Sequence, residues 1–338
     1  MHAIEKRLRE NHNHARYAGG NKGHYESYFQ RANHPERSLA FWNRYTIFSP
    51  RGRPQDAIGE LWSVFFNGET GRHTAVKTEV PINECEFARD EFRVRIQDSF
   101  LTPADLRGSA RNTPEKGGDR IEWDLEYSGD EPPLFNLPHQ FYEKGFPKAK
   151  VLVGLPLAVF RGKILVNNEK FEINDWVGSQ NHNWGSRHTD QYAWGQVAGF
   201  RNAPDAFLEL ATARIKLGPF LSPAMTPIVL RLDGREYRMN NLFSSFRRAE
   251  FRYFHWNFRA ETPELRLEGE ISAKPEDFTC LPYYNPPGGV KFCLNSKIAA
   301  CRLRVKPAHG PELTLETPHR AAFEILTDDT GHGLKPAV

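Results

Sequence analysis

The sequence predicts an all-β protein whose antiparallel strands curl into a sandwich or a barrel. Three observations support this prediction. Aromatic and β-branched segments recur at intervals of about 8 to 15 residues, which is the rhythm of short strands. Turn-forming residues are frequent, with 26 Gly and 24 Pro among 338 residues. Signals for helices are scarce along the whole chain.

The first half of the chain begins with a polar segment and continues with predicted strands. Residues 1–24 are rich in His, Asn and Gly, so we expect a flexible leader, in which "AIEKRLRE" could form about two helical turns. Turn sequences such as "SPRGRPQD", "FNGETG" and "SGDEPP" then separate the strands. The predicted strands are residues 39–48, 57–66, 73–80, 92–101, 119–128 and 150–166.

The same rhythm resumes after residue 190. The predicted strands are residues 191–200, 206–217, 226–234, 235–243, 249–261, 264–273, 290–305 and 321–326. The two halves carry a similar number of strands but show no residue-level repeat. We therefore place a boundary within residues 175–187 and predict an N-terminal domain over 25–177 and a C-terminal domain over 178–330.

Composition excludes several classes of protein. The chain has 45 basic and 42 acidic residues, a formal net charge of +3, which argues against a dedicated nucleic-acid binder. Its four Cys residues form no C-x-x-C pair, so a zinc site built on Cys is not expected. No apolar run approaches the roughly 18 residues that span a bilayer, and no secretory h-region is visible. We expect a cytoplasmic protein with reduced thiols.

Alternation within residues 206–217 places a carboxylate on an apolar face. Residues two apart share a face of a strand, so Glu209 lies with Phe207, Ala211 and Ala213. We expect this small, apolar face to point inward. A bare buried carboxylate is unfavourable, so Glu209 needs a partner or a proton.

The same rule puts Cys293, Asn295, Lys297 and Cys301 on one face of residues 290–305. If this face points inward, its small apolar and polar side chains describe a cavity better than a packed core. One hypothesis is a Glu209–Lys297 ion pair inside the second half. The alternative is that both groups reach the mouth of a barrel and are solvated.

A second candidate carboxylate lies in residues 57–66. Glu60 and Trp62 share a face with Val64 and Phe66, so Trp62 is a candidate wall residue and Glu60 a candidate inward acid. We favour the alternative that Glu60 is exposed near the start of its strand.

The stretch "GSQNHNWGSRHTDQYAWG", from Gly178 to Gly195, concentrates ring and amide side chains. In a functional interpretation, His182, Asn183 and Arg187 converge at the edge of an apolar cavity. In a structural interpretation, the stretch is a folded connector between the halves whose amides satisfy buried backbone groups. Trp184 and Trp194 would then plug a barrel. The two interpretations are compatible, because a rigid hydrogen-bonded network holds a site in place.

Two other kinds of chemistry are less well supported in this stretch. His182, His188 and Asp190 could hold a metal ion, but their spacing fits no pattern such as H-E-x-x-H. No G-x-S-x-G elbow is present for nucleophilic catalysis. Later in the chain, Tyr283 and Tyr284 precede a Pro-Pro-Gly-Gly turn. We expect one of two arrangements: either these Tyr side chains pack across the turn, or one places its ring or hydroxyl over the mouth of a barrel.

The segments "GSQNHNWGSRHTDQYAWGQVAGF", "AFLELATARIKLG", "FTCLPYYNPPGGVKFCLNSKIAACRL" and "NHPERSLAFWNRYTIF" resemble the AttH/CrtC-like lipocalin superfamily. That superfamily includes carotenoid 1,2-hydratases, tocopherol cyclase-like proteins and kievitone-hydratase-like proteins. The resemblance lies in the pattern of residues and extends from about Tyr28 to Val305.

The resemblance implies two lipocalin-like antiparallel β-barrel domains packed together, and a long hydrophobic ligand such as an isoprenoid. Enzymes of this group protonate a carbon–carbon double bond, and water or an internal hydroxyl captures the carbocation. Hydratases and cyclases of the group often carry "DH" before the W-G, where this chain has Asn181. An amide donates no catalytic proton, so His182, Glu209 or Glu60 is the acid, or the reaction is different or absent.

Our first hypothesis is an enzyme that hydrates, cyclises or isomerises an alkene of an isoprenoid-like substrate in a barrel cavity. His182 is its acid or acid-positioner, and Glu209 is the second acid candidate. Substrate-binding candidates are Asn181, Asn183, Trp184, Arg187 (as head-group anchor), His188, Tyr192, Trp194, Tyr283, Tyr284, Asn295, Lys297 and Trp62.

No cofactor or metal is expected, because proton transfer to an alkene uses only protein groups. The expected partner is a hydrophobic small molecule and not a nucleic acid. Peripheral membrane access and the oligomeric state are left open. The second hypothesis is a non-catalytic lipid or isoprenoid carrier that uses the same cavity, and the third is a structural module whose cavity is filled by side chains.

Overall fold

A computed structural model of the protein describes residues 12–338 except 144, 146, 218, 242–244 and 247–248. In this part of the chain nearly all regular structure is β, as predicted. The helical elements described are α2 (Gln140–Glu143) and the 3-10 turns η1 (Pro54–Asp56), η2 (Ile82–Glu84), η3 (Pro114–Lys116) and η4 (Pro275–Asp277). None of the described helices is long and apolar enough to cross a bilayer. The predicted helical segment "AIEKRLRE" lies outside the described residues.

The first sheet has 12 strands in the described part of the chain. In spatial order they are β4 (Arg72–Pro81), β3 (Ile58–Asn67), β2 (Leu39–Ser49), β1 (His24–Asn33), β12 (Glu169–Gly185), β11 (Ala149–Val166), β9 (Arg120–Ser128), β8 (Asp105–Arg111), β7 (Ser99–Leu101), β6 (Val94–Ile96) and β5 (Cys85–Phe87), with β10 (Leu134–Phe135) beside β11.

This sheet curls until β4 approaches β8, so it nearly closes into a barrel. Asn112, just after β8, donates from Nδ2 to the carbonyl of Ala75 at 2.8 Å and accepts the Lys77 N–H. The inside is filled by a packed apolar cluster. Its larger members include Tyr28, Phe41, Tyr45, Tyr127, Phe160, Trp123 and Trp176.

The second sheet has 10 strands among the described residues. In spatial order they are β18 (Arg235–Met239), β17 (Ile228–Leu232), β14 (Ala203–Arg214), β13 (Gln191–Phe200), β24 (Leu313–Thr327), β23 (Val290–Pro307), β21 (Leu265–Ser272), β20 (His255–Glu261) and β19 (Ala249–Arg252), with β22 (Thr279–Tyr284) beside β23. A separate hairpin joins β15 (Lys216–Leu217) and β16 (Phe220–Leu221). Trp256, Phe258, Phe278 and Phe323 anchor this sheet's own apolar cluster.

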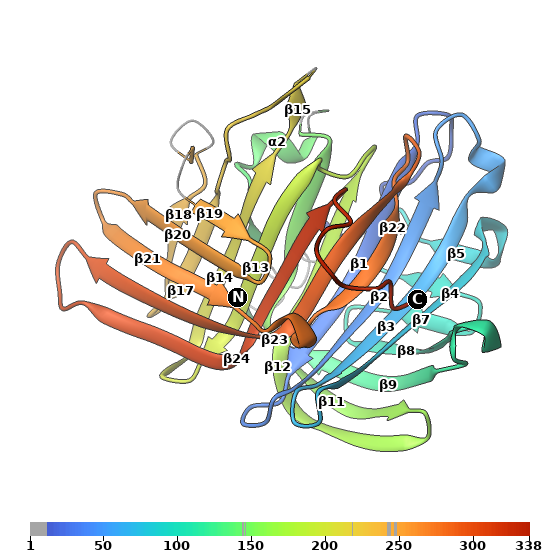
Figure 1. Ribbon diagram of the computed structural model, residues 1–338, viewed down its shortest axis with the longest axis horizontal. Coiled ribbons are helices and arrows are strands. Elements are labelled where there is room, and N and C mark those ends of the chain that lie inside the picture. Colours follow the sequence, from blue (N-terminus) through green and yellow to red (C-terminus); the bar gives the residue numbers. More distant parts are fainter. Residues whose placement is uncertain (1–11, 144, 146, 218, 242–244, 247–248) are drawn as a thin grey trace.

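The two sheets pack against each other along β1–β3 and β23 (Figure 1). A third apolar cluster fills this junction with side chains from both sheets. Its larger members are Phe29, Trp42, Trp62, Phe66, Trp194, Tyr283 and Leu326. Each sheet therefore has its own core, and the large core between them is rich in Trp. A smaller cluster also joins the sheets, made of Leu134, Val153, Ala198, Phe207 and Val229.

The stretch Gly178–Gly185 is not a connector, contrary to our structural interpretation. It forms the second half of β12 and pairs on one side with β1, where Asn181 faces Phe29, and on the other with β11. The crossing between the sheets lies at residues 186–190. Pairing on both sides satisfies the hydrogen bonds of its backbone, so its side chains are not needed for that purpose and project from the two faces of the sheet. The division into domains at residue 178 stays a prediction.

Part of the predicted leader is held against the first sheet. Asn13 is buried and donates from Nδ2 to Gln180 Oε1 at 3.1 Å. The backbone N–H groups of Arg16 and Tyr17 donate to the Glu26 carboxylate. The expectation of a flexible leader is therefore wrong for residues 13–17.

Two predicted strand faces point elsewhere than expected. In β14, Leu208 and Leu210 enter the second sheet's own core, while Phe207 and Glu209 face the first sheet. In β23, an irregularity between Ser296 and Ala299 changes which residues share a face. Residues 293, 295 and 297 therefore face the junction, whereas 299, 301 and 303 enter the second core.

The close approach of β12 to β1 requires glycine at position 178. A Cβ there would lie 1.7 Å from the carbonyl oxygen of Arg31 and 2.6 Å from Cα of Ala32. We expect Gly178→Ala to lower the free energy of unfolding by about 3 kcal/mol or more, because one of the two strands must move. Chemical denaturation measures this change.

Gly129→Ala is the matched control. A Cβ at position 129 would make only ordinary contacts with Leu155, the nearest at 3.4 Å. We expect a change within about 0.5 kcal/mol. Equal stability of the two variants would show that β12 and β1 are not in tight contact at Gly178.

Candidate functional site

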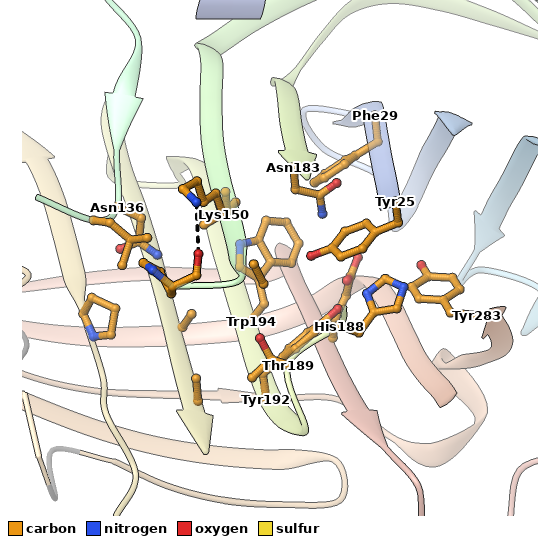
Figure 2. Close-up of a pocket in the computed structure, with 18 of the residues that line it drawn as sticks. Tyr25, Phe29, Asn136, Lys150, Asn183, His188, Thr189, Tyr192, Trp194 and Tyr283 are labelled. Atoms are coloured by element: carbon orange, nitrogen blue, oxygen red, sulfur yellow. Dashed lines mark hydrogen bonds between the residues drawn. The ribbon is translucent and has the colours of Figure 1, made fainter. Parts of the chain in front are cut away.

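A cavity of about 170 Å³ lies between the two sheets (Figure 2). This is room for on the order of ten water molecules, or for a small organic molecule. Its walls come from both sheets: Tyr25, Phe29, Trp42, Arg44, Asn136, Leu137, Pro147, Ala149, Lys150, Val151, Asn183, His188, Thr189, Tyr192, Trp194, Ala211, Ala213, Ile215, Met225, Pro227, Tyr283 and Glu324. The cavity thus lies in the junction between the sheets. Our first hypothesis had placed it inside a barrel.

Aromatic rings form much of the wall. Phe29 meets Trp194 edge-on with ring centroids 5.7 Å apart, and Tyr25 stacks on His188 at 4.0 Å. Burial lowers the pKa of His188 to about 3, helped by the charges of Arg44 and Lys291, so its imidazole is neutral at neutral pH. Burial also raises the pKa of Tyr25, so its hydroxyl stays protonated and can donate a hydrogen bond.

Glu324 places a carboxylate on the cavity wall. Its Oε1 accepts hydrogen bonds from Lys297 Nζ at 2.8 Å and from Asn295 Nδ2 at 3.1 Å. Lys297 is fully buried and also donates to Asn295 Oδ1. Burial lowers the pKa of Lys297, while the nearby Glu324 raises it in part. Lys297 therefore pairs with Glu324, and the hypothesis of a Glu209–Lys297 pair is wrong.

Arg44 is a second charged group on the wall, and only 4% of its surface is exposed. Its guanidinium carbon lies 4.3 Å from the ring centroid of Tyr283. Burial opposes its charge, but Tyr283, Glu60, Tyr192 and Glu324 raise its pKa above the usual value, so Arg44 is charged. Its buried Nε has no hydrogen-bond partner in the structure.

A hydrogen-bond network centred on Gln196 joins the sheets behind the cavity. Gln196 Oε1 accepts from Arg31 Nε at 2.8 Å and from Ser179 Oγ at 2.6 Å. Gln196 Nε2 donates to Asn181 Oδ1 and to Glu209 Oε2, each at 2.9 Å. The Asn181 amide also donates to Ser179 Oγ at 2.9 Å. Both polar atoms of the Asn181 side chain are therefore hydrogen-bonded, and its Oδ1 links the two sheets.

Glu209 connects this network to the cavity wall without lining the cavity. Its Oε1 accepts the indole N–H of Trp194 at 2.7 Å. Burial raises the pKa of Glu209 to about 8, against the hydrogen bonds from Trp194 and Gln196 that lower it. Glu209 thus fixes the orientation of Trp194.

Alternation along β12 divides its polar residues between the two faces of the strand. Asn181 and Asn183 face the second sheet, and Asn183 lines the cavity. His182 and Trp184 face the opposite side, where the His182 ring lies 4.2 Å from Tyr28 and 4.6 Å from Trp184. His182 Nε2 donates to Glu26 Oε1 at 2.8 Å. Burial lowers the His182 pKa, so the ring is neutral.

Glu26 is a buried anion that holds several chain segments together. Besides His182, it accepts hydrogen bonds from His24, from Tyr28 and from the backbone N–H groups of Arg16 and Tyr17. Burial raises its pKa, but the hydrogen bonds from His182 and His24 outweigh that effect and lower the pKa to about 2. The carboxylate is therefore ionised at neutral pH.

The predicted site residues separate into two groups. Those that line the cavity are Asn183, His188, Tyr192, Trp194 and Tyr283. Those that do not are Asn181, His182, Trp184, Arg187, Glu209, Tyr284, Asn295, Lys297 and Trp62. Arg187 bonds Asp190, so its guanidinium already has an anionic partner. The catalytic roles of His182 and Glu209 stay predictions.

Glu60 is buried, so our expectation of an exposed residue is wrong. Its Oε1 lies 2.7 Å from Lys77 Nζ, and Trp62 Nε1 donates to its Oε2 at 3.3 Å. Lys77 in turn lies over the rings of Trp62 and Tyr284, 4.4 and 4.1 Å from their centroids. This group closes the junction next to Tyr283.

Sequence reasoning missed Tyr25, Arg44, Lys150 and Glu324 among the polar wall residues. A signal existed for Arg44, which shares a face with Trp42 and Phe48 in a strand rich in aromatic residues. Glu324 likewise interrupts the apolar run "AAFEIL". No cluster of three or more His, Cys, Asp or Glu side chains suited to a metal ion occurs among residues the structure describes.

Comparisons with known proteins found sequence relatives and, separately, solved structures of the same fold. No family model matches the chain. Two uncharacterised proteins from strains of Mycobacterium tuberculosis are each 23% identical over 210 residues, which is 62% of this chain. The chain spans 60% of the length of these relatives.

Solved structures with the same architecture include a protein assigned as AttH from Nitrosomonas europaea, with a TM-score of 0.54 and 11% identity over 91% of this chain and 94% of that one. Kievitone hydratase from Nectria haematococca gives 0.59 and 10% over 94% and 92%. CghA with Sch210972 gives 0.55 and 12% over 93% and 94%. These likenesses confirm the lipocalin-like, AttH-type fold that the sequence segments indicated.

The ionised state of Glu26 makes stability depend on pH. Its pKa is lower in the folded chain (about 2) than the ordinary value of 4.5. Its contribution is therefore complete above pH 4.5 and is lost as the pH falls toward 2. We expect Glu26→Gln to lower the free energy of unfolding by roughly 3 kcal/mol at pH 7. The variant should also lose less stability than the wild type between pH 4.5 and 2, the acid limb of the stability curve. Denaturation midpoints from pH 7 to pH 2 measure both effects.

The exposed residue Glu312 provides the control, since Glu312→Gln removes a carboxylate without buried partners. If Glu26→Gln retained the acid limb of the wild type, Glu26 would not be the buried anion described above.

Proposed function

We propose that the junction cavity binds a small hydrophobic molecule with a carbon–carbon double bond, and that the protein catalyses its hydration, cyclisation or isomerisation by proton transfer. The observation that carries the proposal is a single carboxylate, Glu324, on the wall of a cavity lined largely by aromatic and apolar side chains. The fold it shares with kievitone hydratase supports this reaction class by analogy.

Glu324 is the proton-transfer group in this proposal. Its partner Lys297 is fully buried, and burial lowers the Lys297 pKa. Lys297 can therefore pass its proton to the Glu324 carboxylate, and Glu324 transfers that proton to an alkene carbon, which leaves a carbocation. In hydration, the oxygen of a water molecule then forms the new C–O bond. The proton that this water loses passes to Glu324 and back to Lys297, so both groups return to their starting state. The net reaction adds one water to the double bond.

The rings around Glu324 suit the cationic intermediate. Phe29, Trp42 and Trp194 present aromatic faces or edges to the cavity, and aromatic faces attract positive charge. Glu209 fixes the Trp194 indole by its hydrogen bond, which makes Glu209 a positioning residue here. An isoprenoid-like substrate suits these walls, and this finer assignment is part of the proposal.

A second candidate function is binding without catalysis. Asn181 stands where hydratases and cyclases of the resembled superfamily often carry Asp, and its amide is already hydrogen-bonded to Gln196 and Ser179. Glu324 would then serve only to neutralise Lys297. The same cavity would carry or sense its ligand unchanged.

Solvent deuterium distinguishes the two functions. We expect wild-type protein, incubated in D₂O with geraniol and geranic acid, to place deuterium on carbon, read by mass spectrometry. Glu324→Gln should reduce the rate by about 10²-fold or more, because a general acid contributes that much. Glu316→Gln, which removes an exposed carboxylate, should leave the rate unchanged.

Unlabelled probes that appear as intact complexes in native mass spectra would favour binding without catalysis. Equal labelling by wild type and Glu324→Gln would remove Glu324 from the mechanism.

A further inference from the structure

One buried positive charge at the cavity, that of Arg44, has no carboxylate close by that is not already paired. Two carboxylates act on Arg44 from a distance, Glu60 and Glu324. Each has a closer cation: Glu60 lies 2.7 Å from Lys77 Nζ, and Glu324 lies 2.8 Å from Lys297 Nζ. The guanidinium of Arg44 forms no ion pair with any residue that the structure describes.

The carboxylates that adjoin β13 and β24 near the cavity also have cationic partners already. Asp190, next to β13, bonds the guanidinium of Arg187, and Asp328, after β24, bonds Lys291. Glu209 lies in the Gln196 network and has a pKa raised to about 8, so it carries little negative charge at neutral pH. Among the described residues, the partners left to Arg44 are the rings of Tyr283 and Trp42, whose centroids lie 4.3 and 5.9 Å from its guanidinium carbon.

A ring alone is a weak partner for a buried cation. Guanidinium carries N–H donors in a planar fork, and a buried charge normally has them paired. Arg44 is 4% exposed, its Nε is unpaired, and it lines the cavity. Carboxylate, like phosphate, is an anion that this fork binds in bidentate geometry.

A second donor faces the same space. The Tyr25 hydroxyl forms no hydrogen bond with any described residue, and its ring projects into the cavity beside His188 (Figure 2). At the other side of Trp194, Lys150 and Asn136 line the cavity, and Lys150 Nζ donates to the Pro147 carbonyl at 3.0 Å. The apolar part of the wall includes Ile215, Ala211 and Ala213.

We infer that the natural ligand is an apolar monocarboxylic acid whose carboxylate binds Arg44. The Tyr25 hydroxyl donates a further hydrogen bond to that carboxylate, and the hydrocarbon part lies along Phe29 and Trp194. Arg44 thus takes the role of head-group anchor that the sequence had suggested for Arg187. This inference rests on the proposed binding function of the cavity and adds the chemical class of the ligand.

The test compares probes that share a carbon skeleton and differ in head group. Geranic acid, geraniol and geranylamine, with octanoic acid and 1-octanol as a second set, are titrated into wild-type protein by calorimetry at pH 7.5. We expect each acid to bind about tenfold or more tightly than its alcohol, because charge-assisted hydrogen bonds replace neutral ones. The amine should bind most weakly.

Variants then locate the preference. Arg44→Gln should abolish the preference for acid over alcohol while leaving alcohol binding within about threefold, since the apolar wall is intact. Arg44→Lys should retain part of the preference, because it keeps the charge but not the fork. Arg107→Gln, an exposed arginine paired with Asp124, is the control and should keep the full preference.

The outcomes separate this inference from the proposed function. Equal binding of acid and alcohol by wild-type protein overturns the inference and leaves the cavity function standing, and this comparison needs no variant to fold. A preference for acids that survives in Arg44→Gln also overturns it. Binding of no probe overturns the cavity function and the inference together.

Discussion

The position of the two sheets depends on one buried amide. Gln196, in β13, accepts hydrogen bonds from Arg31 and Ser179 of the first sheet and donates to Asn181 of the first sheet and Glu209 of the second. Each of these groups is buried, so leaving any one unpaired would be unfavourable. The network therefore sets the sheets in one relative position, and the cavity walls follow from it.

The junction is rich in both charge and aromatic rings. The rings supply the apolar area of the junction, and its charges are neutralised within each sheet. Lys77 pairs with Glu60 in the first sheet, and Lys297 pairs with Glu324 in the second. The hydrogen bonds that cross between the sheets are others, among them those of Arg31 to Gln196 and of Asn33 Nδ2 to the Lys297 carbonyl.

Local patterning was sufficient to predict the all-β class and most strands, because alternation and turn residues act over a few positions. The segments 39–48 and 57–66 correspond closely to β2 and β3. The faces were harder to assign. An irregularity in β23 shifts the alternation at Ser296, and sequence alone does not reveal which residue is extra.

The site was predicted in part for the same reason. Asn183, Tyr192 and Trp194 were identified because the motif concentrates them, but Arg44 and Glu324 come from strands far apart in the chain. Which face of each sheet meets the other is decided by tertiary packing. His182 shows the limit most clearly, since it is adjacent to Asn183 in sequence and on the opposite side of the sheet. Glu60 looked exposed because its partner Lys77 belongs to the next strand.

The cavity walls belong to both sheets, so a bound ligand contacts both and stabilises their association. Thermodynamic linkage requires that any molecule held only by the assembled protein adds its binding free energy to assembly, about 2.7 kcal/mol at a concentration one hundred times Kd. Neither sheet alone possesses the pocket. Ligand binding and the association of the two sheets are therefore coupled. Without a ligand, the junction between the sheets should open more often than it does with one bound.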